Sequence, residues 1–366
     1  MYFKRGTTTR QAHVDIPEGT VEEEYAREGF SGRASHLYRE KPPVEWMDIE
    51  GDLRPHALEL VELPGLGAPD YLDSRVPILR NEDTTVSMAR LVKAMDYDFR
   101  NADGDETLFV HTGGGRIETD FGPLNYERGD YLVIPRGTSY RLVPSEPTEL
   151  LVIETRGAID IPDRGLLGHH ALFDPDVIEV PHPEARNRPS DDGKWRLKIK
   201  LKDACTTVTY RHDPMNVVGW KGDLTVWRLN IDDIRPISCE RYHLPPTAHA
   251  TFVADGVVIA TFLPRPLETG DPGALKVPFY HANVDYDEVL FYHDGDFFSR
   301  EGIEAGMATF HPRGLPHGPQ PGAVEAARDK ERTEEKAVMI DTVRPLDLCE
   351  AGAAVSRPDY WQSWNP

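Results

Sequence analysis

The segment Asp287-Glu-Val-Leu-Phe-Tyr-His-Asp-Gly295 decides the fold, because a close copy of it occurs earlier in the chain. The earlier copy, Asp105-Glu-Thr-Leu-Phe-Val-His-Thr-Gly113, is identical at six of nine positions and begins 182 residues upstream. Further along, Pro135-Arg-Gly137 matches Pro312-Arg-Gly314 at a spacing of 177 residues. Recurrence of one pattern at a nearly constant spacing indicates a duplicated structural unit. The halves therefore differ by one small loop.

The duplicated unit is predicted to be β structure. The 31 prolines and 30 glycines are scattered, as in proteins built from short strands joined by turns. Strand patterns occupy 98–154, 195–201, 205–210, 224–230 and 256–262. Helical signals are few, and they cover Pro17 to Glu28, Thr85 to Ala94 and a charged surface helix or loop from Pro321 to Lys336. We expect a mainly β protein with a few short helices.

Bulk composition restricts the functional class. The chain has 366 residues, with 41 basic and 62 acidic side chains and a formal charge of −21. Nucleic-acid binding needs a basic surface, so a nucleic-acid partner is not expected. No apolar run approaches the roughly 18 residues of a membrane helix, and the first residues lack the apolar core of a signal peptide. Three widely spaced cysteines, Cys205, Cys239 and Cys349, give no disulfide framework, which favours a reducing cytoplasm.

The repeat also suggests a division of the chain. Residues 1–160 are predicted to hold an N-terminal arm and a first, metal-free barrel, and 161–194 a connector over the surface. Residues 195–366 are predicted to form a second, metal-binding barrel with a C-terminal tail. The arm, up to about residue 60, contains apolar side chains such as Phe3 and Trp46 that are costly to leave in water. We expect it to cover sheet edges or to reach a partner subunit.

The second copy contains a candidate metal site that the first copy lacks. His281 and Glu288 stand at two ends of a predicted turn between strands, and His317 follows on a returning segment. Two histidines and one carboxylate with open positions suit a non-heme Fe(II) site. The repeat places Phe99 opposite His281 and Tyr140 opposite His317. We therefore expect one metal per chain, in the C-terminal half.

Other polar residues near this set leave alternatives open. Asp287 is a rival carboxylate, although Glu288 keeps the spacing to the glycine that closes the repeat. His293 recurs in the first copy, where no metal set exists, and is predicted to be structural. His311 is either a fourth ligand or a contact behind the ligands and for the substrate, and the second interpretation is favoured. The connector histidines are expected to be surface residues.

Four motifs together resemble a known family. They are Asn216-Val-Val-Gly-Trp-Lys-Gly-Asp223, Tyr242-His-Leu-Pro-Pro246, Phe279-Tyr-His-Ala-Asn283 followed by Glu288, and Pro316-His-Gly-Pro319. In these the sequence is similar to the homogentisate 1,2-dioxygenase family. The resemblance covers most of the chain and is strongest from about residue 210 to 320. It implies a bicupin, that is, two jelly-roll barrels, of which one binds metal.

The resemblance also implies a chemistry and residue roles. It implies Fe(II) held by the trio and cleavage by O2 of the ring of a 2,5-dihydroxyphenyl acid such as homogentisate, giving a maleyl-type product. His243 takes the place of the family's acid/base histidine beside the phenolic hydroxyl, with His249 as the other histidine of its loop. Asn283, His311 and Arg300 are expected to bind the substrate. A homo-oligomer is also implied.

The sequence departs from the family pattern around the expected substrate site. Arg300 stands where the family has a lysine, and Phe279 and Phe297 stand where it has tyrosines. An arginine can hold a carboxylate through two hydrogen bonds, but two missing hydroxyls indicate a less polar or differently held substrate. Two other functions were weighed: a cupin oxygenase or isomerase with another metal and substrate, and a non-catalytic binding bicupin. An open metal position favours an enzyme.

Overall fold

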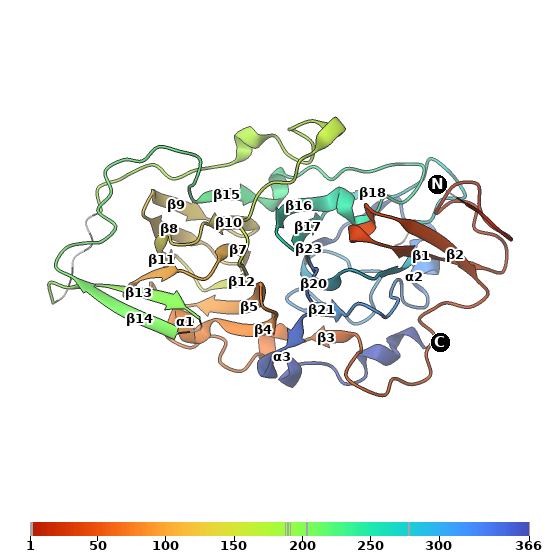
Figure 1. The fold of residues 1–366 in the computed structure, drawn as a ribbon, viewed down its shortest axis with the longest axis horizontal. Coiled ribbons are helices and arrows are strands. Elements are labelled where there is room, and N and C mark those ends of the chain that lie inside the picture. The colour runs from red at the N-terminus through yellow and green to blue at the C-terminus, as the bar shows by residue number, and fades with distance from the viewer. Residues whose placement is uncertain are drawn as a thin grey trace.

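The computed structural model describes residues 3–186, 188, 190, 192–202, 204–276 and 279–365. Two β-barrels lie side by side along the long axis of the molecule (Figure 1), as a bicupin requires. In the described residues α-helices are short: α1 (Tyr71–Ser74), α2 (Ala323–Ala327) and α3 (Glu350–Ala354). Single 3-10 turns make up the remaining helix. The mainly β fold with few helices is confirmed.

The first barrel consists of two sheets. The seven-stranded sheet has the order β15-β10-β7-β12-β5-β4-β24, and the six-stranded sheet the order β14-β13-β6-β11-β8-β9. The strands up to β12 are β4 (Val76–Arg80), β5 (Thr84–Leu91), β6 (Asp98–Asn101), β7 (Asp105–Thr112), β8 (Gly115–Thr119), β9 (Gly122–Tyr126), β10 (Asp130–Ile134), β11 (Ser139–Pro144) and β12 (Thr148–Thr155). The others are β13 (Trp195–Leu201), β14 (Ala204–Tyr210), β15 (Trp227–Asn230) and β24 (Asp347–Leu348).

The second barrel combines a six-stranded sheet, β16-β17-β23-β20-β21-β3, with a three-stranded sheet, β19-β1-β2. A short pair, β18 with β22, flanks it. The strands are β1 (Val21–Ala26), β2 (Ala34–Arg39), β3 (His56–Leu58), β16 (Ala250–Ala254), β17 (Val257–Phe262), β18 (Arg265–Pro266), β19 (Tyr280–Asn283), β20 (Asp287–Asp294), β21 (Ala308–His311), β22 (Arg332–Thr333) and β23 (Lys336–Thr342).

The duplication seen in the sequence is also present in the strand pairing. Glu106 pairs with Ile134 between β7 and β10, and Glu288 pairs with His311 between β20 and β21. Phe99 pairs with Tyr140 in the first barrel. In the second barrel the equivalent positions, His281 and His317, form an antiparallel bridge. The residue equivalences inferred from the repeat are therefore correct in three dimensions.

The terminal segments cross between the barrels. The β1–β2 hairpin lies at the edge of the second barrel, where β1 runs parallel to β19. The β13–β14 hairpin lies in the same way on the first barrel, parallel to β6. In return β24, near the C-terminus, pairs with β4 of the first barrel. The arm covers a sheet edge, as expected. The division at residues 160 and 194 stays a prediction, and these pairings cross it.

Two helix predictions were wrong. Residues 17–28 contain strand β1, and residues 85–94 lie largely in β5. In β1 the apolar periodicity is misleading, because three buried glutamates, Glu22, Glu23 and Glu24, follow one another in a strand that is covered on both faces. In β5 the pairing with β4 and β12 overrides a weak local helix signal. The surface segment 321–336 does contain a short helix, α2.

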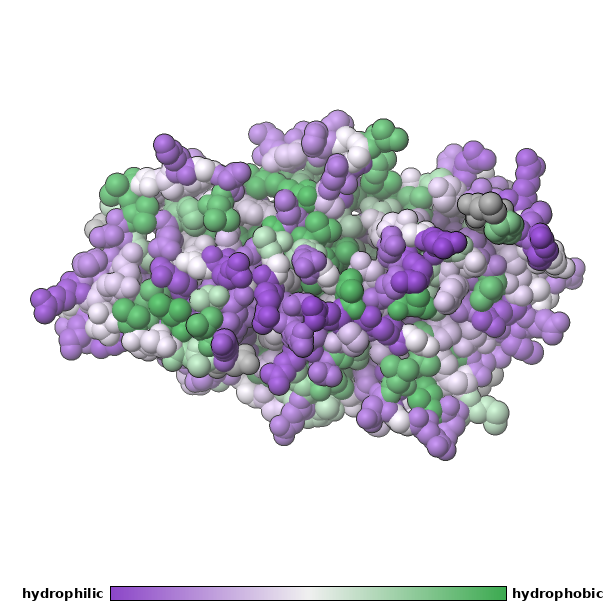
Figure 2. Space-filling model, in the orientation of Figure 1, coloured by the Kyte–Doolittle hydropathy of each residue, from purple (hydrophilic) through white to green (hydrophobic). Residues whose placement is uncertain are grey.

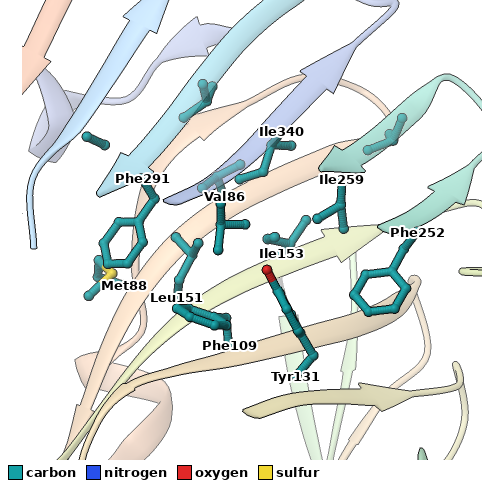
Figure 3. Packing of buried hydrophobic residues seen from close by; sticks show 14 of the residues in the cluster. Val86, Met88, Phe109, Tyr131, Leu151, Ile153, Phe252, Ile259, Phe291 and Ile340 are labelled. Atoms are coloured by element: carbon teal, nitrogen blue, oxygen red, sulfur yellow. The ribbon is translucent and has the colours of Figure 1, made fainter. Parts of the chain in front are cut away.

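One apolar core joins the two barrels. Figure 3 shows Phe109 and Tyr131 of the first barrel packed among Phe252, Ile259 and Phe291 of the second. The Tyr131 hydroxyl lies 2.9 Å from Thr261 Oγ1, so the polar end of this tyrosine is satisfied across the interface. Burial of so much shared apolar surface makes the pair of barrels one structural unit.

The repeated histidines meet at this same interface. His111 Nδ1 and His293 Nδ1 are 2.9 Å apart, and both rings are buried. The structure therefore places His293 in a contact between the barrels, which agrees with the structural role expected for it.

The outer surface is polar. The face in Figure 2 is predominantly hydrophilic with separate hydrophobic patches, as the charge of −21 would suggest. Among the described residues, no helix has the length and apolar character needed to cross a membrane.

Candidate metal centre

Three elements of the second barrel bring the predicted trio together. His281 lies in β19, Glu288 is the second residue of β20, and His317 is held by two backbone hydrogen bonds to His281, of 2.8 and 2.9 Å. Glu288 Oε2 lies 3.9 Å from His281 Nε2 and 3.3 Å from His317 Nε2. One donor atom from each residue falls within 4.8 Å of the other two. Such a spacing allows one ion to touch all three.

The imidazole nitrogens that face this point have no hydrogen-bond partner. His281 Nδ1 lies 2.7 Å from the carbonyl oxygen of Phe279, to which it can donate, which leaves Nε2 as the lone-pair nitrogen. His281 Nε2 and both ring nitrogens of His317 are buried and lack a hydrogen bond to any described residue. Buried polar atoms without partners are costly in a folded protein. A metal ion with nitrogen and oxygen ligands would satisfy them, so the residues fit such an ion.

His311 holds the carboxylate in position. Its Nδ1 lies 2.9 Å from Glu288 Oε1, its Nε2 lies 3.4 Å from the Tyr360 hydroxyl, and its ring stacks on that of His317. Burial lowers the pKa of His311 to about 3, so the ring is neutral. Since His311 contacts Glu288 through one nitrogen and Tyr360 through the other, it lies behind the ligands. This geometry agrees with the favoured interpretation rather than with a fourth ligand.

The charge at the centre is carried by Glu288. Burial raises the pKa of this carboxyl, but the surrounding imidazoles, His317 foremost, hold it well below its usual range. Asp341, which pairs with Glu288 across β23 and β20, shows the opposite behaviour. Burial and the nearby carboxylate of Glu288 raise the pKa of Asp341 well above normal, so it is a neutral acid. Asp341 was missed in the sequence, where the only signal is an acid at the end of the apolar run Ala337-Val-Met-Ile.

The rival carboxylate, Asp287, is engaged elsewhere. Its Oδ1 accepts hydrogen bonds from Arg313, and its Oδ2 accepts one of 2.8 Å from the Leu346 amide. Neighbouring residues of a strand point to opposite faces, so Asp287 faces away from the interior that Glu288 faces. It lines a separate cleft of about 960 Å³ that also contains His56. Glu288, not Asp287, thus shares the trio's interior.

His243 lies on the far side of an aromatic ring from the trio. Its ring packs edge-on against Phe279, with centroids 5.9 Å apart, and Phe279 in turn lies 5.5 Å from His281. His243 Nδ1 is 3.0 Å from the buried carboxylate of Glu268, a partner that the sequence gave no means of finding. The alternative, His249, is buried below the same loop, and burial lowers its pKa well below normal. Of the two, His243 contacts the ring beside the metal ligands.

The other predicted substrate contacts are buried near the trio. Asn283 follows His281 by two residues on β19, and its Oδ1 accepts a 3.3 Å hydrogen bond from the Asp285 amide. Arg300 is 8% exposed and donates to the carbonyl oxygen of Gly318, one residue beyond His317. Its Nε is buried without a hydrogen bond to a described residue. Arg300 therefore has an N–H available for a further acceptor.

In the first barrel a guanidinium takes the place of the ion. Glu106, the counterpart of Glu288, forms a buried ion pair with Arg75, which also binds Glu154 at 2.7 Å. Phe99 and Tyr140, which replace the two histidines, pack edge to face beside it with centroids 5.4 Å apart. The retained carboxylate is thus neutralised by a fixed cation. This arrangement explains how the first barrel keeps its glutamate without metal ligands.

Comparison with known proteins gives matches over the whole chain. Residues 72–231 match a family model described as homogentisate 1,2-dioxygenase N-terminal. A “Putative dioxygenase” of Saccharolobus solfataricus is 33% identical over 99% of this chain and 98% of its own. The homogentisate 1,2-dioxygenase of Bradyrhizobium diazoefficiens is 26% identical over 75% of this chain, which spans only 64% of that protein's length.

A solved cupin 2 conserved barrel domain protein from Leptotrichia buccalis aligns with 74% of this chain and 88% of its own, at 12% identity and a TM-score of 0.32. That score is too low for the likeness to carry weight. The two-barrel architecture rests instead on the strand order described above.

Replacing Arg75 by Met should destabilise the protein by about 3–5 kcal/mol, because it leaves the buried Glu106 carboxylate without a cation. The double variant Arg75→Met/Glu106→Gln should recover most of that loss. Urea unfolding followed by circular dichroism measures both. Arg328→Met, at an exposed ion pair, is the control and should change stability by less than about 0.5 kcal/mol. Equal loss in the single and double variants would show that Glu106 does not need the guanidinium.

Proposed function

We propose a function from one premise: the chain belongs to the homogentisate 1,2-dioxygenase-like family of enzymes. The proposed activity is Fe(II)-dependent cleavage by O2 of the ring of a hydroquinone-type aromatic acid, such as homogentisate, to a maleyl-type product. The observation that carries it is the buried trio of His281, Glu288 and His317, whose inward nitrogens have no partner. Two histidines and one carboxylate leave ion positions open for two reactants.

The choice of Fe(II) follows from the ligand set and the reaction class. A mixed set of two imidazoles and one carboxylate with open positions is typical of non-heme Fe(II) oxygenases. When bound, the iron would supply adjacent positions for the phenolate and O2 and a route for electrons between them. The protein's own contribution is then to hold three ligands rigidly. His311 does so for Glu288, and the Phe279 carbonyl oxygen does so for His281.

His243 is proposed as the acid/base residue. With Nδ1 against the Glu268 carboxylate, Nδ1 carries the proton and Nε2 is left to accept one from a phenolic hydroxyl. For this, the aromatic substrate must lie beside Phe279, between His243 and the trio. Glu268 positions the imidazole and stabilises it once it is protonated, so that the ring can later return the proton.

Arg300 is proposed to bind the substrate's carboxylate. Its charge is buried, and the unpartnered Nε–H is available to an acceptor near His317. Asn283 would supply a polar contact on the other side of His281, and His311 would act mainly through Glu288. The proposal also includes a homo-oligomer in a reducing cytoplasm, and light scattering of the purified protein tests the first of these.

Removal of a trio histidine should remove iron. In protein loaded anaerobically with Fe(II), His281→Ala and His317→Ala should each lose about one iron per chain relative to the unaltered protein, since two remaining ligands bind weakly. Phe99→Leu and Tyr140→Phe, at the equivalent positions of the first barrel, are the matched controls and should keep it. Metal analysis by mass spectrometry gives the result. Undiminished iron in His317→Ala would refute the assignment.

Oxygen uptake should identify the substrate class. Anaerobic Fe(II)-loaded protein is mixed with homogentisate, gentisate or plain hydroquinones, and oxygen consumption is followed after air is admitted. We expect uptake with a 2,5-dihydroxyphenyl acid and much less with hydroquinones that lack the carboxylate, because Arg300 would then be left unpaired. No uptake with any compound would exclude the proposed reaction and favour a cupin enzyme with a different substrate.

Truncation of His243 should affect turnover and not iron. His243→Ala should keep its iron content while the turnover number falls by about 10²–10⁴-fold, the range for loss of a general acid/base. His249→Ala is the matched comparison within the same loop and should retain more activity. Normal turnover in His243→Ala would transfer the acid/base role to His249.

A further inference from the structure

A second group of histidines and carboxylates lies outside both barrel interiors. Glu22 and Glu24 are two residues apart in β1 and share one face of that strand. His36 of β2 stands directly opposite Glu24 in the antiparallel register. His13, from the turn before β1, packs over them. Four potential metal ligands thus come from three chain segments that meet at one face of the arm.

The four side chains are close and mostly buried. His13 Nε2 lies 3.1 Å from Glu24 Oε2, and His13 Nδ1 lies 2.5 Å from Glu22 Oε1. His36 Nδ1 lies 3.6 Å from the same Glu22 oxygen. His13, Glu22 and Glu24 are each at most 6% exposed. One ligand atom each from His13, Glu24 and His36 falls within 4.8 Å of the other two, the same condition that the trio meets.

The charge of this group is unbalanced. Two buried carboxylates face it, and within the described residues their ion pairs are with His13 and His36 only. The intervening Glu23 points to the opposite face, where Arg39 pairs with it. Buried carboxylates require a cation, either a protonated imidazole or a metal ion. With both histidines neutral, the group carries two negative charges.

Unpartnered nitrogens point to a metal ion rather than to a proton alone. The Nδ1 atoms of His13 and His36 are buried and make no hydrogen bond to a described residue, although Glu22 lies near both. Metal-binding imidazoles commonly give their second nitrogen to a carboxylate. Glu22 stands where it can serve both Nδ1 atoms, which leaves the Nε2 atoms free to bind an ion with Glu24.

We propose that His13, Glu24 and His36 bind a divalent transition-metal ion, with Glu22 orienting the two imidazoles. Nitrogen and carboxylate ligands of this kind suit Zn²⁺ and its first-row neighbours. The ion would be separate from the one in the second barrel, and its ligands come entirely from the arm.

The position gives this ion a structural effect on the first site. The His13 ring stacks on Phe279, with centroids 3.9 Å apart and planes 9° from parallel. Glu24 is the parallel-strand neighbour of His281. An ion bound to the arm would therefore rigidify the hairpin that holds β19 and one face of Phe279. Its loss should loosen the arm before it disturbs the barrel.

The test is a zinc titration of the full-length, metal-free protein, followed by calorimetry and by metal analysis after dialysis. We expect two Zn²⁺ per chain in the unaltered protein, one in His36→Ala, one in His317→Ala and none in the double variant. His170→Ala, at an exposed connector histidine, is the control and should bind two. Because the two sites are scored by separate variants, failure of one assignment leaves the other testable.

The near-isosteric variant Glu24→Gln covers the case in which His36→Ala does not fold. Introduced into His317→Ala protein, it should abolish the visible absorption of added Co²⁺. One Zn²⁺ in the unaltered protein, lost in His317→Ala and unaffected by Glu24→Gln, would overturn the proposal. The group would then be a proton-balanced ion pair.

Discussion

A carboxylate buried in a protein interior must be matched by positive charge, and much of this structure depends on how that is done for one repeated glutamate. In the second barrel Glu288 is enclosed by imidazoles whose free nitrogens call for a metal ion. In the first barrel its counterpart, Glu106, is neutralised by Arg75. The same fold thus offers an exchangeable cation in one copy and a covalently attached one in the other. Only the exchangeable cation leaves coordination positions for chemistry.

The site depends on segments far apart in the chain. β19 carries His281 and is held at its edge by β1, whose hairpin begins some 250 residues earlier. Tyr360, near the C-terminus, contacts His311 behind the ligands. The barrel alone does not complete the centre, because the arm covers one side and the tail the other. Substitutions in either segment can therefore alter the site without touching a ligand.

The sequence predicted the parts of the structure that are repeated. The matching segments gave the two barrels, the trio and the silent positions Phe99 and Tyr140, since identical residues at a fixed spacing occupy equivalent strands. Pairing between distant segments was not predictable. Strand β1 reads as a helix because its partners, β19 and His36 of β2, lie far along or across the hairpin. Glu268 and Arg75 were missed for the same reason: their roles exist only through contacts that folding creates.

The crossed terminal segments have a consequence for the order in which the chain can fold. During synthesis β1 and β2 leave the ribosome first, but β19, which pairs with β1, follows about 250 residues later, a delay of roughly 10–50 s. The first barrel has nearly all its strands by then, whereas the arm must wait as an unpaired hairpin. Closure of the second barrel around β1 is a long-range contact and is expected to be slow. The metal centre is thus among the last parts of the molecule to form.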